Sequence, residues 1–163
     1  MQSFVLTSHS VEETRQFGRV LGRVAETGTL ILLSGDLGAG KTSFTQGLGA
    51  GLDIPEDEPV VSPSYTLMNH YQGRLDLFHF DLYRLSSSED LDDIDFDSYL
   101  DAGGVTVVEW CDRVPDVSRD GLLIRIEHAD NDCRRFFFEA ETAVACKVLQ
   151  NFSRVLADGT ACS

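Results

Sequence analysis

Residues 35–42 read Gly-Asp-Leu-Gly-Ala-Gly-Lys-Thr, which matches the G-x-x-x-x-G-K-[ST] pattern of a phosphate-binding loop. The apolar run 30–33 before the loop is typical of a buried strand, and residues 43–48 after it can open a helix. A loop between a strand and a helix N-terminus directs backbone N–H groups at phosphate oxygens, and the helix end adds partial positive charge. A glycine-rich turn that matches by chance would not need this context. The motif therefore predicts a nucleotide site in an α/β fold.

The backbone and the side chains of the motif have different expected roles in binding a nucleotide. We expect Lys41 to reach the β- and γ-phosphates of ATP and the Thr42 hydroxyl to bind Mg²⁺. ATP and Mg²⁺ are thus the expected ligand and cofactor. The backbone expected to surround the phosphates belongs to Gly35, Leu37, Gly38, Ala39 and Gly40.

Two carboxylates are candidates for the remaining chemistry, which needs a metal ligand and a group that orients the attacking water or acceptor. Glu109 follows the apolar run 105–108, so we expect it at the carboxyl end of a central strand, where open α/β sheets bind ligands. Asp81 interrupts the apolar segment 75–83, where a carboxylate needs a partner or a metal. The predicted catalytic residues are therefore Lys41, Asp81 and Glu109. The alternatives are a solvated strand end for Glu109 and a hairpin surface position for Asp81.

A Ser-Pro segment lies between these motifs and carries several hydroxyl groups. Hydroxyls on a proline-stiffened loop could sense the γ-phosphate or Mg²⁺, as switch loops do. Ser-Pro segments also mark ordinary turns, and a lone tryptophan is as readily a packed core residue. The candidate switch residues are Ser62, Ser64, Tyr65 and Thr66, and Trp110, directly after Glu109, could cover the nucleotide or meet a partner.

The whole pattern predicts a single domain over residues 1–163, because strands alternate with helices and no long linker or repeat interrupts them. The fold class is α/β, a three-layer P-loop NTPase-like fold with a central, mostly parallel sheet and an added β-hairpin. The hairpin is expected from residues 62–71 and 75–83, which are β-prone runs around a Gln-Gly turn. Helices are expected over residues 10–26, 86–101 and 142–156, and further strands over 122–127 and 136–140.

The formal net charge is −14, so a broad direct contact with tRNA or DNA is not expected. The first six residues lack the basic start and apolar core of a signal peptide, and no apolar run approaches the ~20 residues that span a bilayer. No membrane contact and a cytoplasmic location are expected. Reduced thiols are expected as well, because no C-x-x-C spacing joins the four cysteines, which are Cys111, Cys133, Cys146 and Cys162.

Four segments together resemble the TsaE (YjeE) family. They are the loop at 35–42, Ser-Pro-Ser-Tyr-Thr-Leu at 62–67, His-Phe-Asp-Leu-Tyr-Arg-Leu at 79–85 and Val-Glu-Trp at 108–110. The loop alone is common to many NTPases, whereas the 79–85 block joined to a later Glu-Trp is much more specific. The resemblance covers nearly the whole chain.

This resemblance implies a bacterial P-loop ATPase with weak intrinsic hydrolysis, which its partners stimulate. The family works with a TsaD-like threonylcarbamoyltransferase subunit and the paralogous TsaB-like subunit, which together attach threonylcarbamoyl to N6 of an adenosine in tRNA. Contact with tRNA would then be indirect. One position departs from the family pattern: Ser64 stands where threonine is usual, which keeps the hydroxyl and loses a methyl group.

Carried over by motif, the family's site places Mg²⁺ on Thr42 and Glu109. Asp81 would support the metal or the water, and Trp110 would belong to the second switch. The start of the first helix, near Val11, would approach the adenine.

Two other functions remain open at this point. A small-molecule or nucleotide kinase needs an acceptor pocket and usually an Arg-rich lid, and the acidic segment 89–101 contains no arginine. A nucleotide-gated binding module would use the same switch loops with incidental hydrolysis. Arg134 and Arg135 could reach a nucleotide or lie on the surface beside a strand.

Overall fold

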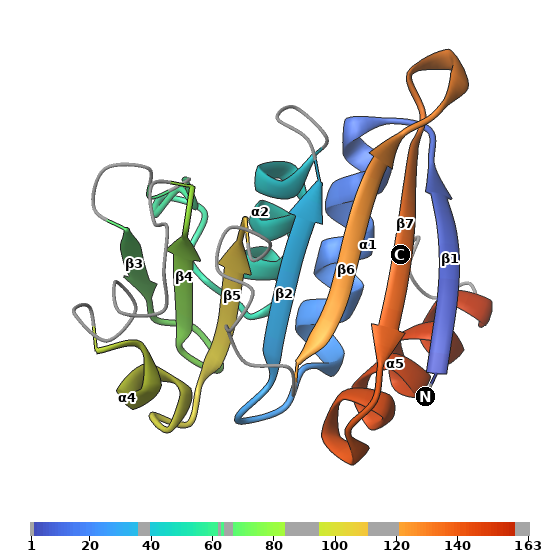
Figure 1. The fold of residues 1–163 in the computed structure, drawn as a ribbon. Coiled ribbons are helices and arrows are strands. Elements are labelled where there is room, and N and C mark those ends of the chain that lie inside the picture. Colours follow the sequence, from blue (N-terminus) through green and yellow to red (C-terminus); the bar gives the residue numbers. More distant parts are fainter. Residues whose placement is uncertain are drawn as a thin grey trace.

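The computed structural model describes residues 2–35, 40–61, 63, 67–83, 95–110 and 121–158 (Figure 1). Its strands are β1 (Gln2–Ser8), β2 (Leu30–Gly35), β3 (Met68–Tyr71), β4 (Leu77–Asp81), β5 (Val105–Glu109), β6 (Leu122–His128) and β7 (Arg134–Ala140). Its helices are α1 (Val11–Val24), α2 (Lys41–Gly51), α4 (Phe96–Leu100) and α5 (Ala143–Ala157), with a 3₁₀ turn at Asp130–Asp132.

The strands form one sheet in the order β1-β7-β6-β2-β5-β4-β3. Its central strands β6, β2, β5 and β4 are parallel, while β7, β1 and β3 are added antiparallel at the edges. The predicted α/β fold and the β3–β4 hairpin are therefore confirmed. Strands β2, β4 and β5 are buried almost throughout, as is usual for parallel strands covered on both faces, whereas β6 alternates between buried and exposed residues.

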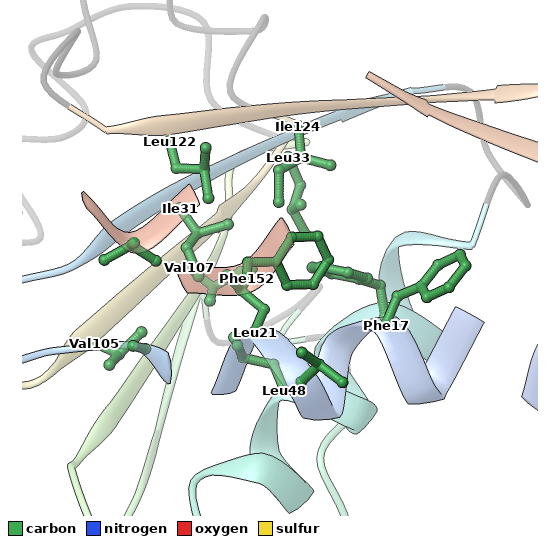
Figure 2. Packing of buried hydrophobic residues seen from close by; sticks show 14 of the residues in the cluster. Phe17, Leu21, Ile31, Leu33, Leu48, Val105, Val107, Leu122, Ile124 and Phe152 are labelled. Carbon is green, nitrogen blue, oxygen red and sulfur yellow. The ribbon is translucent and has the colours of Figure 1, made fainter. Parts of the chain in front are cut away.

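Helices cover both faces of the sheet. On one face α1, α2 and α5 pack over a core in which Phe17 and Leu21 of α1 and Leu48 of α2 meet the inward residues of β2, β5 and β6 (Figure 2). On the other face α4 packs Phe96 and Tyr99 against Phe80 of β4. This arrangement gives the expected three layers.

The contact between α1 and α2 depends on small residues. Glycines on each helix face the backbone of the other at four positions: Gly18, Gly22, Gly47 and Gly51. A Cβ atom at Gly47 would lie 2.0 Å from the carbonyl oxygen of Arg15. The backbone of α2, the helix that follows the glycine-rich loop, is thus in direct contact with the backbone of α1.

The other helices and strands differ from the sequence-based expectations mainly in the residues at which they begin and end. Helix α1 begins after Ser10, at the start of the helix expected over residues 10–26, and the Ser10 hydroxyl accepts a hydrogen bond from the Glu13 N–H at 3.0 Å. The acidic helix predicted over residues 86–101 is seen only as α4, since its first part lies outside the described residues. Strand β1 was not predicted; it pairs with the distant β7.

Two smaller findings bear on the expectations from composition. None of the helices in the described ranges is both long and apolar enough to cross a bilayer. Cys133 and Cys146 are free thiols, while Cys111 and Cys162 lie outside the described residues.

Candidate nucleotide site

The carboxyl ends of β2, β4 and β5 meet at one edge of the sheet, where α2 also begins (Figure 1). Glu109 pairs in register with Leu33 of β2 on one side and with Asp81 of β4 on the other. Residues in register on neighbouring parallel strands share a face, so both carboxylates point to the side that carries α2. The placement of Glu109 at the end of a central strand is as predicted.

Both carboxylates are buried, with 3% of Asp81 and 2% of Glu109 exposed. The alternatives considered from sequence, a solvated strand end and a hairpin surface residue, are therefore wrong. Asp81 is covered because β4 is not an edge strand but is paired on both sides, by β3 and β5. Its Oδ1 accepts a hydrogen bond from the Tyr83 N–H at 2.9 Å, which fixes the carboxylate at the strand end.

Lys41 lies at the first position of α2 and is buried, with 5% exposed. Its Nζ donates to the Gly35 carbonyl at 2.5 Å and lies 3.9 Å from the centre of the Trp110 ring. Gly40 caps this helix with φ 112°, a conformation that suits glycine and not an L side chain. The ammonium group is therefore held between the loop and the residue that follows Glu109.

Trp110 has a strained backbone, with φ 60° directly after β5. Such a left-handed conformation costs a bulky residue about 1–2 kcal/mol and is often found at functional sites. Its ring packs edge-on against Tyr83, with ring centres 4.9 Å apart. The alternative of a deeply packed core tryptophan is not what the structure has, because Trp110 is only partly buried and contacts Lys41.

Glu109 has a partner that was not among the predicted site residues. The Nε2 atom of His79 lies 2.5 Å from its Oε2, and both side chains are almost fully buried. The signal was present in the sequence, because His79 and Asp81 are two residues apart on a strand and so share a face. What the sequence did not show is that the histidine reaches the neighbouring strand.

The other predicted residues divide into two groups. Thr42 is half-buried in the first turn of α2, beside Lys41. Val11 is 55% exposed at the start of α1, at the same end of the sheet (Figure 1). Seven predicted residues lie outside the described part of the structure: Leu37, Gly38, Ala39, Ser62, Ser64, Tyr65 and Thr66.

Arg134 lies at the start of β7, and its Nη1 donates to the carbonyls of Asp132 and Cys133 at 3.1 and 3.2 Å. Arg135 follows it on the exposed side of the strand. Both arginines therefore lie at the start of β7, next to the β6–β7 turn.

The side chains at this site suit a cation that takes most of its ligands from water and phosphate oxygens, with only a few from the protein. Within the described ranges, no group of three or more His, Cys, Asp or Glu side chains could enclose a metal ion. Mg²⁺ usually takes one or two carboxylates and completes its octahedron with waters and phosphate oxygens. The Thr42 hydroxyl and the carboxylates of Asp81 and Glu109 fit that pattern. Two buried carboxylates on adjacent strands also repel each other, and a divalent cation would relieve that repulsion.

Comparisons with known proteins show which family this chain resembles. The model of the family described as "Threonylcarbamoyl adenosine biosynthesis protein TsaE" matches residues 8–136. The tRNA threonylcarbamoyladenosine biosynthesis protein TsaE of Treponema pallidum is 46% identical over 107 residues, which are 66% of this chain and 78% of that protein. The protein of the same name from Nostoc is 41% identical over 129 residues, covering 76% and 78%.

A solved structure is also similar along nearly the whole chain. The crystal structure of YdiB from Bacillus subtilis superposes with a TM-score of 0.82 at 30% identity, covering 94% of this chain and 95% of that one. The family match spans the strand–loop–helix unit together with Asp81 and Glu109. The chain belongs to the TsaE family, whose proteins take part in tRNA threonylcarbamoyladenosine biosynthesis.

Proposed function

We propose that this protein binds ATP with Mg²⁺ and hydrolyses it in the service of tRNA N6-threonylcarbamoyladenosine synthesis. It would act on the threonylcarbamoyltransferase complex and would not carry out the transfer itself. The observation that carries the proposal is the convergence of Lys41, Asp81 and Glu109 at the carboxyl edge of the parallel strands. Family membership supplies the pathway.

The chain's residues would divide the work as follows. Lys41 would exchange its bond to the Gly35 carbonyl for the β- and γ-phosphate oxygens, since the ammonium already lies at the start of α2. Thr42 and Glu109 would hold Mg²⁺, which neutralises charge on the phosphates when it is bound. Asp81, fixed by the Tyr83 N–H, would orient the attacking water or a water on the metal.

Trp110 is placed to report the state of this site. Trp110 contacts Lys41 and follows Glu109 directly. A change in the position of either residue would therefore change the environment of the Trp110 ring. Its strained backbone would favour an alternative conformation once the contact with Lys41 is lost. This is the behaviour expected of a switch segment, whose conformation partner proteins recognise.

The partners we propose are a TsaD-like transferase subunit and its TsaB-like paralogue. A chain with net charge −14 would be repelled by RNA, so tRNA would be held by the partners. The same charge would favour association with a basic patch on a partner, at a rate that falls with added salt.

ATPase measurement with and without the two partner proteins, beside a threonylcarbamoyladenosine synthesis assay, tests the proposal. We expect slow phosphate release by the chain alone, faster release with the partners and no phosphorylated acceptor. A phosphorylated small molecule would instead identify a kinase. Unstimulated release with full support of synthesis would indicate a binding module that only senses the nucleotide.

A further inference from the structure

We propose that His79 is a positioning residue, which holds the Glu109 carboxylate in the orientation that Mg²⁺ binding requires. The inference rests on the proposed function and extends it to a residue that was given no role from the sequence. It depends on how the two side chains meet between neighbouring strands.

The contact is short, buried and specific in its atoms. The Nε2 of His79 on β4 lies 2.5 Å from Oε2 of Glu109 on β5, with 0% and 3% of the two side chains exposed. An ionised carboxylate can only accept, so the Nε2–H donates. One carboxylate oxygen is thereby tied to β4, and the carboxylate cannot rotate without breaking this bond.

A histidine at this position lowers the stability of the fold, which indicates that it is kept for a functional reason. The strand around it is entirely buried, and His79 lies on the face that carries the apolar core residue Leu77. Its second ring nitrogen, Nδ1, is buried and has no hydrogen-bond partner among the described residues. An unsatisfied buried polar atom costs about 1–3 kcal/mol. An aliphatic residue here would avoid that cost, but it would leave Glu109 buried without this donor.

Metal-ligating side chains commonly depend on such outer partners. Loss of the partner typically weakens metal binding or activity about 10- to 100-fold. Here the bond engages Oε2, so the other oxygen, Oε1, would be presented to the cation. His79 would thus act on the metal through Glu109, without touching the nucleotide.

Two amide variants separate a positioning role from simple filling of the core. In His79→Gln the amide nitrogen can occupy the position of Nε2, three bonds beyond Cβ. In His79→Asn the shorter side chain can reach only the position of Nδ1. Both variants are polar and uncharged, so they differ chiefly in whether a donor can reach Glu109. His79→Leu removes the donor altogether.

The measurement is the affinity for a non-hydrolysable ATP analogue by calorimetry, with Mg²⁺ and with EDTA. We expect the gain in affinity from Mg²⁺ to fall about 10-fold or more in His79→Asn and His79→Leu, and to be largely restored in His79→Gln. Affinity in EDTA should change little, because Lys41 and the loop bind phosphate without His79. His70→Gln is the matched control: this histidine pairs with Asp76 at 3.3 Å, half-exposed on β3, away from the site.

The outcomes separate the two proposals. If the wild-type protein binds the analogue no better with Mg²⁺, the proposed function fails, and this role fails with it. If the wild type shows the gain and both His79→Asn and His79→Leu keep it, only the positioning role is overturned. Equal losses in His79→Gln and His79→Asn would likewise overturn it, since they would indicate a packing defect. The Gln–Asn comparison is sufficient even if the Leu variant does not fold.

Discussion

Gly47 offers a quantitative test of how the nucleotide site is supported. In an ordinary helix interior, replacing glycine by alanine stabilises a protein by about 0.5–1 kcal/mol. At this position the added Cβ would lie 2.0 Å from the oxygen, 2.7 Å from the carbonyl carbon and 2.9 Å from the Cα of Arg15. All three are backbone atoms of α1, so no side-chain rotation can relieve the clash. Helices α1 and α2 would have to move apart.

The expected size of the effect follows from two opposed terms. Overpacking a tight contact costs about 1–3 kcal/mol, and the helix propensity of alanine offsets part of this cost. We therefore expect Gly47→Ala to lower the free energy of unfolding by about 1–2 kcal/mol. For a chain of this size that corresponds to a drop in Tm of about 2–8 °C.

Urea and thermal denaturation of the wild type and the variant measure the change. Ala50→Gly is the matched control, because Ala50 is exposed on the same helix and reports propensity alone. We expect that control to lose about 1 kcal/mol, which shows that alanine is otherwise the better residue in α2. A Gly47→Ala variant as stable as the wild type, or more stable, would refute the claim that the helices touch at backbone distance.

The nucleotide site yields further predictions. Lys41→Ala should abolish detectable binding of ATP in calorimetry, because the buried ammonium is the cation of the loop. Glu109→Gln should slow hydrolysis about 100-fold or more and lower the Mg²⁺-dependent affinity for nucleotide at least as much as His79→Leu does, about 10-fold, as single-turnover assays and calorimetry would show. Gly40→Ala should weaken nucleotide binding and cost about 1–2 kcal/mol of stability, because φ is 112° there. Trp110 is the only tryptophan, so its emission should change on titration with Mg-ATP, and an unchanged spectrum would contradict the exchange of its contact with Lys41.

The parts of the site that could be predicted are those set by local order along the chain. A buried strand, the loop at 35–42 and a helix start form one continuous segment, and Glu109 directly follows its own strand. The relative positions of such sequence neighbours can be predicted without knowing the order of strands in the sheet. The bond between His79 and Glu109 could not be predicted in the same way, because it requires β4 and β5 to be adjacent and in one register.

Strand β1 was missed for a related reason. Residues 2–8 are short and only weakly alternating, and they become a strand by pairing with β7, more than a hundred residues away. Burial of Asp81 likewise depends on β5, which pairs with β4 on the side opposite to β3. In each case a contact between distant segments set the outcome, and no local pattern along the chain reveals such a contact.

The charges at the site explain why Mg²⁺ should matter so much here. Lys41 is the one cation that the described part of the site contributes, while Asp81 and Glu109 bring two buried carboxylates towards the same sheet edge. A triphosphate entering alone would meet those carboxylates at low dielectric, where repulsion between like charges is strong and weakly screened. The N-terminus of α2 would offset only part of this repulsion. A divalent cation between the carboxylates and the phosphates would reverse the sign of the interaction. The acidic residues would then select the metal-bound nucleotide over the free one, and their burial would make that selection strong.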